Sequence, residues 1–318
     1  MPLESMTELL LDARRRNYAV CYCESWNVES FEGVLEAAEE TASPIIAGFN
    51  GGFLMHPERT KPENLALYAG LGQALATVSI PVSFLLNETD DLPQIRYGLE
   101  LGFNAVMVES DHLGPADYLQ VVKETAQIAH SRGVSVEAQV GRLPYLGDRG
   151  ESRGEMTDPA AAKRFVQETE VDALGISIGN VHVLTKGQAS IDLESLARIR
   201  DLIEIPLVIH GGTGFPLHLA AEAIRLGVAK FNFGTALKQA YLQAIDKGLK
   251  DYSAGSDPHP FLGIGGKKDI MVAGKEAVKK KVKELLAATG SAGKAARRGG
   301  DNPSSAGGGA ETTEWSTR

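Results

Sequence analysis

Short runs of hydrophobic residues alternate with longer amphipathic stretches along most of this chain. The run at 206–209 is apolar at every position, which is typical of a parallel strand covered on both faces. The pattern predicts eight strands, at 18–23, 44–49, 81–86, 105–108, 135–138, 173–178, 206–210 and 230–233. Between them it predicts helices, for example at 31–40, 64–76, 116–131, 159–168 and 217–226.

A strand followed by a helix, repeated eight times, predicts an α/β fold of the (β/α)8 TIM-barrel type. The chain has 318 residues, of which 43% are hydrophobic, and this is enough for one large core. An open, doubly wound sheet is the alternative. No G-x-G-x-x-G motif opens the first helix, however, so a dinucleotide site has little support.

Three segments depart from the strand–helix repeat. Residues 142–157, after the fifth strand, are polar and contain glycine, and the segment is long enough for an active-site loop. Residues 258–288 read as a turn followed by a lysine-rich helix. The low-complexity stretch GGDNPSSAGGGAETTEWST near the end predicts disorder. We therefore expect a barrel with a C-terminal helical extension over 1–295 and a disordered tail over 296–318.

The overall charge narrows the possible partners. A net charge of −9 and a pI near 5.4 argue against nucleic acid or an anionic membrane as the main partner. Two cysteines, Cys21 and Cys23, exclude a disulfide framework, fit a reducing compartment and are expected in the core. The first residues mix acidic and basic side chains without the long apolar run of a signal peptide, and no membrane span is apparent. The sequence thus predicts a cytoplasmic protein.

Ionisable side chains gather at the predicted strand ends. His182 follows the sixth strand and His210 ends the seventh, while Glu88 follows the third and Glu109 the fourth. Because the carboxyl ends of barrel strands meet at one mouth, we expect these groups to converge. Two imidazoles and a carboxylate are donors that suit zinc and its neighbours in the periodic table. Packing in the rim is the alternative for a single histidine, but two at consecutive strand ends favour a metal site.

Two glycine-containing turns follow the last two strands. They are His210-Gly-Gly-Thr-Gly214 and Asn232-Phe-Gly-Thr235, and each precedes a predicted helix. Barrels commonly bind phosphate at this position, because glycine backbone N–H groups and a helix N-terminus point at the anion. Two ordinary turns are the alternative. Their joint position favours a phosphate site that includes Gly234.

These motifs together resemble the class II, zinc-dependent fructose- and tagatose-bisphosphate aldolase family. The similarity extends over 6–295 and is carried by Val34-Leu-Glu-Ala-Ala-Glu-Glu40, Ser135-Val-Glu-Ala-Gln-Val-Gly-Arg-Leu143, Thr157-Asp-Pro159, Pro206-Leu-Val-Ile-His-Gly-Gly-Thr-Gly214, Gly227-Val-Ala-Lys-Phe-Asn232 and Gly290-Ser-Ala-Gly-Lys-Ala295. The resemblance implies a homodimer or homotetramer in carbohydrate metabolism. It also implies a catalytic zinc that polarises a ketose carbonyl and stabilises the enediolate left by carbon–carbon cleavage.

The resemblance assigns roles to individual residues. His182 and His210 match the family's two later metal histidines. Lys186 matches a lysine in the loop after the sixth strand. The family's contacts to phosphate and ketose are matched by Gly211, Gly212, Thr213, Asn232 and Thr235.

The sequence departs from the family where protons are transferred. The family's Leu-Asp-His-Gly reads Leu86-Asn87-Glu88-Thr89, so the catalytic Asp is Asn87 and the first metal His is Glu88. An amide cannot exchange a proton at neutral pH, so Asn87 cannot be the general acid/base. Glu88 completes a set of two histidines and one carboxylate with His182 and His210, suited to zinc, manganese or iron.

The proton-transfer role therefore passes to another carboxylate. Glu24 stands where the family has an amide after the first strand, and we expect it to be the general acid/base. Glu88 and Glu109 are the alternatives. The functional prediction is a metal-dependent aldolase that cleaves or forms a phosphorylated ketose such as a ketose bisphosphate. The alternatives are an isomerase or dehydratase acting through a metal enolate, and a non-catalytic barrel that binds sugar phosphate.

Overall fold

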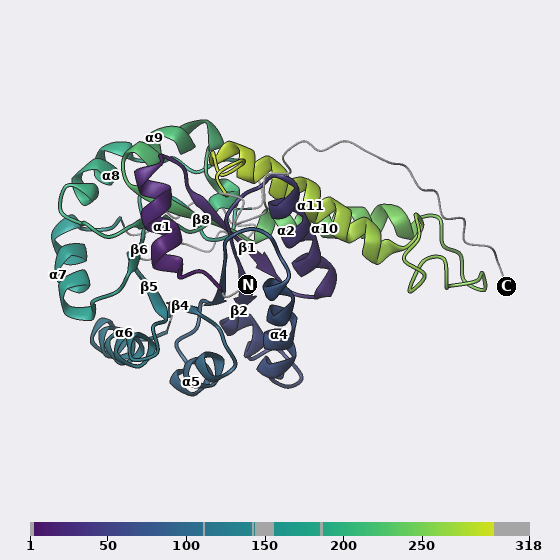
Figure 1. The fold of residues 1–318 in the computed structure, drawn as a ribbon, viewed down its shortest axis with the longest axis horizontal. Helices are drawn as coiled ribbons and strands as arrows, with labels where there is room; N and C mark the ends of the chain where they lie inside the picture. Colours follow the sequence, from purple (N-terminus) through teal and green to yellow (C-terminus); the bar gives the residue numbers. More distant parts are fainter. Residues whose placement is uncertain (1–2, 111, 142, 144–155, 185–186, 296–318) are drawn as a thin grey trace, which may run out of the picture.

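Eight parallel strands close into one barrel in the computed structural model, which describes residues 3–110, 112–141, 143, 156–184 and 187–295 (Figure 1). The strands follow one another around the barrel in chain order. They are β1 (Val20–Ser25), β2 (Ile45–Asn50), β3 (Val82–Asn87), β4 (Ala105–Val108), β5 (Ser135–Val140), β6 (Ala173–Ile176), β7 (Leu207–Ile209) and β8 (Val228–Phe233). The predicted (β/α)8 fold is confirmed.

Helices connect the strands and surround the barrel (Figure 1). Several start at a side chain that accepts a hydrogen bond from the first turn, such as Asn27 and Asp158, so the polar residue before the apolar run sets the start. The helices are α1 (Met6–Arg15), α2 (Val28–Glu40), α3 (Gly51–Leu54), α4 (Leu65–Leu71), α5 (Leu92–Glu100), α6 (Pro115–His130), α7 (Pro159–Thr169), α8 (Leu193–Arg200), α9 (Ala220–Arg225), α10 (Thr235–Leu249) and α11 (Ile270–Ala288).

Two predicted helices are shorter than expected. The helix expected at 64–76 is divided into α4 and a 3-10 helix, Gly72–Ala76. At this junction Gly72 lies against the ring of Phe84, which a Cβ at position 72 would meet at 2.4 Å. The helix expected at 217–226 begins as a 3-10 turn, Leu217–Leu219, and becomes α9.

The barrel is filled from inside and closed at one end. Tyr22, Ile46, Leu85 and Met107 come from successive strands and form one buried cluster inside it. The apolar face of α1 belongs to the same cluster, and Figure 1 shows this helix lying across the barrel. Because α1 covers the amino ends of the strands, the carboxyl ends form the open mouth, where barrel enzymes bind their substrates.

The C-terminal extension is packed onto the barrel as well. In Figure 1, α10 and α11 run side by side away from the barrel, with α2 against them. Lys275 and Lys279 of α11 bind the Glu36 carboxylate of α2 at 2.8 and 2.9 Å. The predicted C-terminal helix is confirmed. The predicted tail, and most of the loop expected at 142–157, lie outside the described residues.

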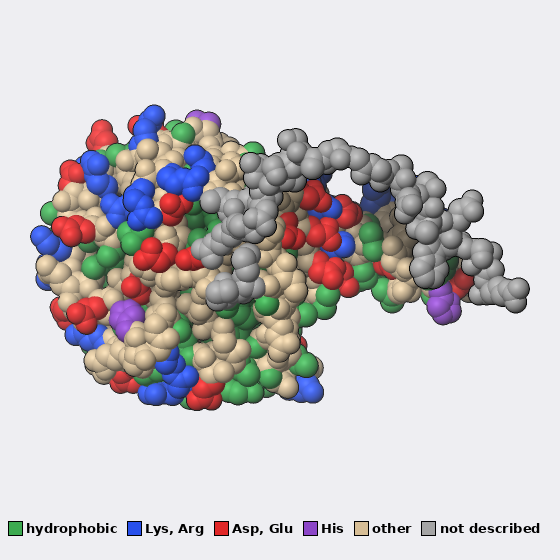
Figure 2. Space-filling model, in the orientation of Figure 1, with side chains coloured by type: hydrophobic (Ala, Val, Ile, Leu, Met, Phe, Trp, Pro, Cys, Tyr) green, Lys and Arg blue, Asp and Glu red, His purple; other side chains and the backbone are tan. Residues whose placement is uncertain are grey.

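The outer surface mixes both signs of charge. On the face drawn in Figure 2, acidic and basic side chains are interspersed over the helices instead of forming one patch of a single sign. Cys21 and Cys23 are buried in the core, as expected. Among the helices described, none has the length and apolar character that crossing a membrane requires.

Candidate active site

Three side chains from different strand ends form a possible metal-binding group. They are Glu88 after β3, Glu109 after β4 and His210 after β7, and one ligand atom of each lies within 4.8 Å of the others. In the strand order, β3 and β7 are not neighbours and lie on opposite sides of the barrel. Their ends meet only because the sheet closes into a barrel with one mouth. Two carboxylates and an imidazole, all directed into one mouth, are donors that a divalent cation can use.

Glu88 reaches this group through a left-handed backbone conformation. Its φ is +53°, which costs an ordinary residue about 1–2 kcal/mol. The turn is held by two backbone hydrogen bonds, from Gly52 N–H to the Glu88 carbonyl (2.8 Å) and from Thr89 N–H to the Met107 carbonyl (3.2 Å). Asn50 also donates to the Glu88 carboxylate. Strain of this kind persists where surrounding contacts determine it and is concentrated at functional sites.

His210 is oriented by a buried ion pair. Its Nε2 lies 2.8 Å from Glu137 Oε1, and Lys230 Nζ donates to Glu137 Oε2 at 2.7 Å. Glu137 and Lys230 are fully buried in the barrel. With Nε2 engaged by Glu137, Nδ1 is left facing Glu88 Oε1 at 3.5 Å. A carboxylate behind the histidine is the usual way to fix the ring of a metal ligand.

Electrostatics favour a cation in this cluster. Burial raises the pKa of Glu137, but Lys230 and His210 outweigh it and hold that pKa below its ordinary value. For His210, burial has the opposite effect and lowers the pKa. The hydrogen bonds to Glu137 and Glu88 outweigh burial, so the pKa of His210 is raised overall. The carboxylates that favour a proton on His210 favour a divalent cation equally, since metal and proton compete for the same nitrogen. The residues present therefore fit a metal ion.

His182 lies beside the group instead of completing it. Its Nε2 is 3.5 Å from Glu88 Oε2 and its Nδ1 is 3.8 Å from Glu109 Oε1. The rings of His182 and His210 have their centres 6.4 Å apart. The sequence suggested Glu88, His182 and His210 as ligands, whereas the group whose ligand atoms lie within 4.8 Å of one another contains Glu109 in place of His182. Each of the four side chains nevertheless lies within 3.8 Å of another of the four.

The two glycine turns meet at the start of α10. Gly211 has a φ of +67°, and a Cβ there would lie 1.8 Å from the Val181 carbonyl oxygen, so only glycine fits. Thr213 Oγ1 accepts a hydrogen bond from the Ala236 N–H (3.0 Å), which ties the first turn to the helix. Gly234 lies directly before α10. The positive end of this helix dipole is a feature that suits an anion at this point.

One cavity of about 300 Å³ joins these features. The predicted phosphate residues that line it are Gly211, Thr213, Asn232, Gly234 and Thr235, and Glu24, Glu88 and His182 line it too. Gly212 packs beneath, where a Cβ would meet the Asn232 carbonyl at 2.7 Å. Lys186, the remaining predicted residue, lies outside the described residues.

Glu24 and Asn87 occupy different environments. Glu24 is the penultimate residue of β1 and lines the cavity, and Lys238 of α10 donates to its Oε1 at 2.6 Å. A Cβ at position 234 would lie 2.2 Å from Glu24 Oε2, so glycine at 234 makes room for this carboxylate. Burial raises the pKa of Glu24, and Lys238 offsets part of the rise. Asn87 is buried, and its Oδ1 has no hydrogen-bond partner among the described residues; it is not part of the cavity lining.

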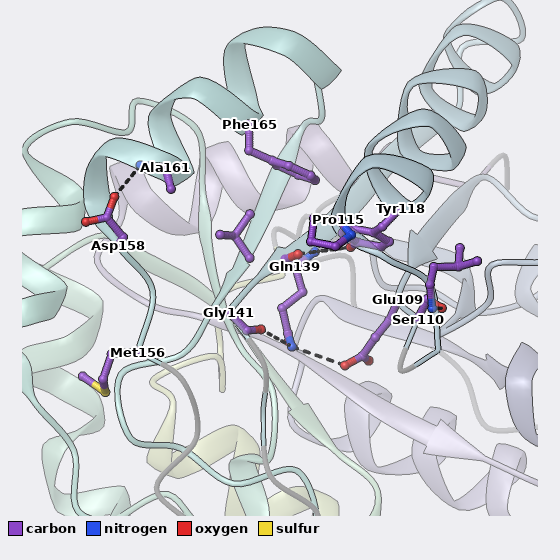
Figure 3. A pocket seen from close by; sticks show the side chains of 12 residues that line it. Glu109, Ser110, Pro115, Tyr118, Gln139, Gly141, Met156, Asp158, Ala161 and Phe165 are labelled. Atoms are coloured by element: carbon purple, nitrogen blue, oxygen red, sulfur yellow. Dashed lines mark hydrogen bonds between the residues drawn. The ribbon is translucent and has the colours of Figure 1, made fainter.

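A second cavity, of about 410 Å³, opens where β4 and β5 end, between α6 and α7 (Figure 3). Gln139 Nε2 donates to Glu109 Oε1 (3.2 Å) and to the Gly141 carbonyl (3.1 Å), as Figure 3 shows. Tyr118 donates its hydroxyl to the Val108 carbonyl at 2.9 Å. Glu109 therefore borders this cavity and is held by Gln139 as it joins the metal-binding group.

A closed (β/α)8 barrel with ionisable strand-end side chains converging on one cavity is the architecture of a TIM-barrel enzyme. The family model for class-II fructose-bisphosphate aldolase matches residues 4–294, and the chain belongs to this family. The resemblance inferred from the sequence is confirmed. The protein is accordingly an aldolase-type carbon–carbon lyase, of a family that uses a divalent metal and acts on phosphorylated ketoses.

Solved structures agree with this assignment. The YdjI aldolase from Escherichia coli K12 is 26% identical, with a TM-score of 0.76 over 93% of this chain and 100% of its own. A putative fructose-1,6-bisphosphate aldolase from Coccidioides immitis is 24% identical, with a TM-score of 0.76 over 91% and 97%. Fructose-bisphosphate aldolase from Campylobacter jejuni is 20% identical, with a TM-score of 0.70 over 92% and 97%. The last two support the fold.

The sequence pattern assigned no role in the site to Glu137, Lys230 and Lys238. A signal existed for the first two, because each is a charged residue inside a barrel strand, and such a residue is buried only when it is paired. Lys238 carries no such signal, because it lies on a half-exposed helix face, 214 positions from its partner Glu24.

Proposed function

We propose that this protein is a zinc-dependent aldolase that cleaves or forms the C3–C4 bond of a ketose carrying a phosphate at C1. One observation carries the proposal: the group formed by Glu88, Glu109 and His210 faces the same mouth as the glycine turns at the start of α10. Glu88 and His182 line the same small cavity as the glycine turns, and this arrangement suits a substrate with a carbonyl close to a phosphate.

Glu88, His182 and His210 are the ligands we propose for the metal, with Glu109 as a further carboxylate in reach. Nitrogen and oxygen donors in this number suit zinc. Zinc bound there supplies Lewis-acid polarisation of the ketose carbonyl. Glu137 holds His210 in place through Nε2, and Lys230 keeps Glu137 charged. These two residues position a ligand and do not touch the substrate.

The phosphate is assigned to the turns Gly211–Thr213 and Asn232–Thr235. Their support is the left-handed Gly211, the link from Thr213 to the helix, and the N-terminus of the 15-residue helix α10. Lys186 is a further proposed contact. A phosphate held there by backbone N–H groups gains charge-assisted hydrogen bonds of about 1.5–3 kcal/mol each.

Glu24 is the general acid/base that we propose. In cleavage it takes the proton of the C4 hydroxyl; the C4 oxygen becomes an aldehyde, the C3–C4 bond breaks, and its electron pair passes to the C2 carbonyl as an enediolate. The enediolate then takes up a proton at C3. Both products, the aldehyde and dihydroxyacetone phosphate, are released. Glu88 is less suited, because a carboxylate bound to a cation is a weak base. Glu109 is the alternative base.

We also propose that the protein is a homodimer or homotetramer. Its support is the set of large apolar side chains exposed on α10 and the segment that follows: Leu249, Tyr252, Leu262 and Ile264. Apolar groups gathered on one projecting element are typical of a protein–protein contact.

Metal analysis of the purified protein, combined with a cleavage screen of phosphorylated ketoses, tests the proposal. We expect about one divalent ion per chain and release of dihydroxyacetone phosphate that a chelator abolishes. Metal-bound protein that isomerises or dehydrates the same compounds, without breaking a carbon–carbon bond, would contradict the aldolase assignment. So would bound metal with no turnover at all.

A further inference from the structure

A further cavity, called the compartment below, adjoins the 300 Å³ cavity beside the glycine turns, on the side of β1 and β2. Its volume is about 470 Å³. Glu24, Phe53 and Lys238 line both spaces, so the two are continuous across the Glu24–Lys238 pair. If the phosphate lies at the glycine turns, the opposite end of a ketose points past Glu24 into this compartment.

Three aromatic side chains stand among the polar residues of its walls. They are Trp26, Phe53 and Tyr68. Trp26 is fixed by an edge-on contact with Tyr241 (5.4 Å between ring centres), and Tyr68 by one with Phe49 (5.0 Å). Rigid aromatic faces of this kind stack on the C–H groups of sugars and on apolar chains.

The cations of the compartment already have partners. Lys238 pairs with Glu24 at 2.6 Å and lies 4.3 Å from the centre of the Phe53 ring. Arg59 is ion-paired with Glu63. Glu58 adds another carboxylate to the lining. Among the described residues, then, no arginine or lysine of this lining lacks a carboxylate partner, and a phosphate there would have to displace one.

One buried hydroxyl in the compartment lacks a partner. Ser25 lines the compartment and is only 2% exposed, and its Oγ has no hydrogen-bond partner among the described residues. A buried hydroxyl is costly to leave unpaired, so it favours a ligand with a hydrogen-bonding group, such as the hydroxyl of a sugar.

We infer that this compartment binds the aldehyde-derived end of the substrate, and that this end is uncharged. The substrate class is then a ketose 1-phosphate with a polyhydroxy or deoxy tail, in contrast to a ketose bisphosphate. The inference rests on the proposed function, because that function sets which end of the ketose reaches Glu24.

The test uses dihydroxyacetone phosphate and the metal-loaded enzyme in the condensation direction. Without an acceptor, exchange of a C3 proton for solvent deuterium reports the half-reaction that the proposed function requires. Acceptors are then compared as matched pairs, D- and L-glyceraldehyde against their 3-phosphates. We expect exchange, and a kcat/KM for the better unphosphorylated acceptor at least about tenfold above its phosphate, equal to about 1.4 kcal/mol.

Two variants locate the preference. Tyr68→Ala should raise KM for glyceraldehyde by about tenfold while the exchange rate stays unchanged, because Tyr68 lines this compartment and not the cavity beside the glycine turns. Glu63→Gln releases Arg59 and should raise kcat/KM for the phosphorylated acceptor. Leu202→Ala, at an exposed position far from the mouth, is the control.

The outcomes separate the two ideas. Exchange with a preference for the phosphorylated acceptors overturns the inference and leaves the aldolase assignment intact. Exchange without condensation of any acceptor also overturns it. No exchange by metal-loaded enzyme overturns the proposed function, and the inference with it.

Discussion

Lys230 donates a hydrogen bond to Glu137 at 2.7 Å, and both side chains are completely buried inside the barrel. The second oxygen of Glu137 accepts from His210. A charged pair at this depth is retained at a desolvation cost of several kcal/mol per ion. Its role is accordingly to hold His210 at the mouth, and the pair links the centre of the barrel to the proposed metal site.

Removing the lysine of this pair should destabilise the fold. Lys230→Met leaves Glu137 charged and unpaired, and we expect a loss of about 3–5 kcal/mol in the free energy of unfolding. Urea unfolding of the metal-free protein measures it. The double variant Lys230→Met/Glu137→Leu should recover most of the stability but bind metal more weakly, since His210 has lost its partner. A single variant as stable as the wild type would refute this account.

Loss of a ligand should lower metal occupancy. His182→Ala, His210→Ala and Glu88→Gln should each weaken binding of the divalent ion by more than about tenfold. Titration of the chelated protein with zinc measures the affinity. His259→Ala is the control, because that side chain is 75% exposed and distant from the mouth. Full occupancy after replacement of both His182 and His210 would exclude the proposed site.

A side chain at Gly211 should impair phosphate binding. Gly211→Ala places a Cβ against the Val181 carbonyl in a left-handed residue, so the turn must rearrange. Inhibition by inorganic phosphate should weaken by about 10–100-fold, the equivalent of one lost charge-assisted contact. Gly255→Ala is the matched control, because Gly255 is also left-handed (φ +89°) but a Cβ there would meet open space. Equal inhibition of both variants would place the phosphate elsewhere.

Glu24→Gln should lower kcat by about 10²-fold, the usual effect of removing a positioned acid/base, without changing metal content. The amide oxygen that replaces the carboxylate still accepts the hydrogen bond from Lys238, so the local structure is preserved. Single-turnover cleavage of a ketose 1-phosphate measures the chemical step. If Glu24→Gln turns over normally while Glu88→Gln keeps its metal and loses activity, Glu88 is the base.

The pH dependence of kcat should report on Lys238. Burial raises the pKa of Glu24 above the usual 4.5, and the positive charge of Lys238 partly offsets this. A base is active when deprotonated, so activity should fall as the pH drops through this raised pKa. Lys238→Met removes the offset, and the acidic limb of the profile should move to higher pH. Lys238→Arg keeps the charge and should restore the limb; a profile that is identical in all three proteins would contradict the assignment.

The strands were predictable because each is an apolar run between polar turns, and β4 matches its prediction residue for residue. Most other strand ends differ by one or two positions; β1, β2, β3 and β5, for example, extend one or two residues beyond their predicted ends. The division of α4 was not predictable. It depends on the close contact between Gly72 and Phe84, two residues that only the folded barrel brings together.

The candidate site, like the fold, could be predicted only in part from the sequence. Residues at strand ends, such as Glu88 and His210, could be expected at one mouth from the repeat alone. The repeat could not predict which side chain completes this cluster, because the position of Glu109 depends on its hydrogen bond from Gln139. Contacts between β1 and α10, such as the one from Lys238 to Glu24, also arise only when the barrel closes.

At the turn of Glu88, main-chain contacts determine the backbone conformation, whereas the side chain determines the chemistry. Main-chain hydrogen bonds from Gly52 N–H to the Glu88 carbonyl, and from Thr89 N–H to the Met107 carbonyl, hold this corner, and neither involves the side chain of Glu88. Left-handed positions accept asparagine, aspartate and histidine more readily than other non-glycine residues. The backbone contacts that hold this corner therefore do not require a carboxylate. Replacing Glu88 by a neutral histidine would alter the charge of the proposed metal site by one unit, while both main-chain hydrogen bonds could remain.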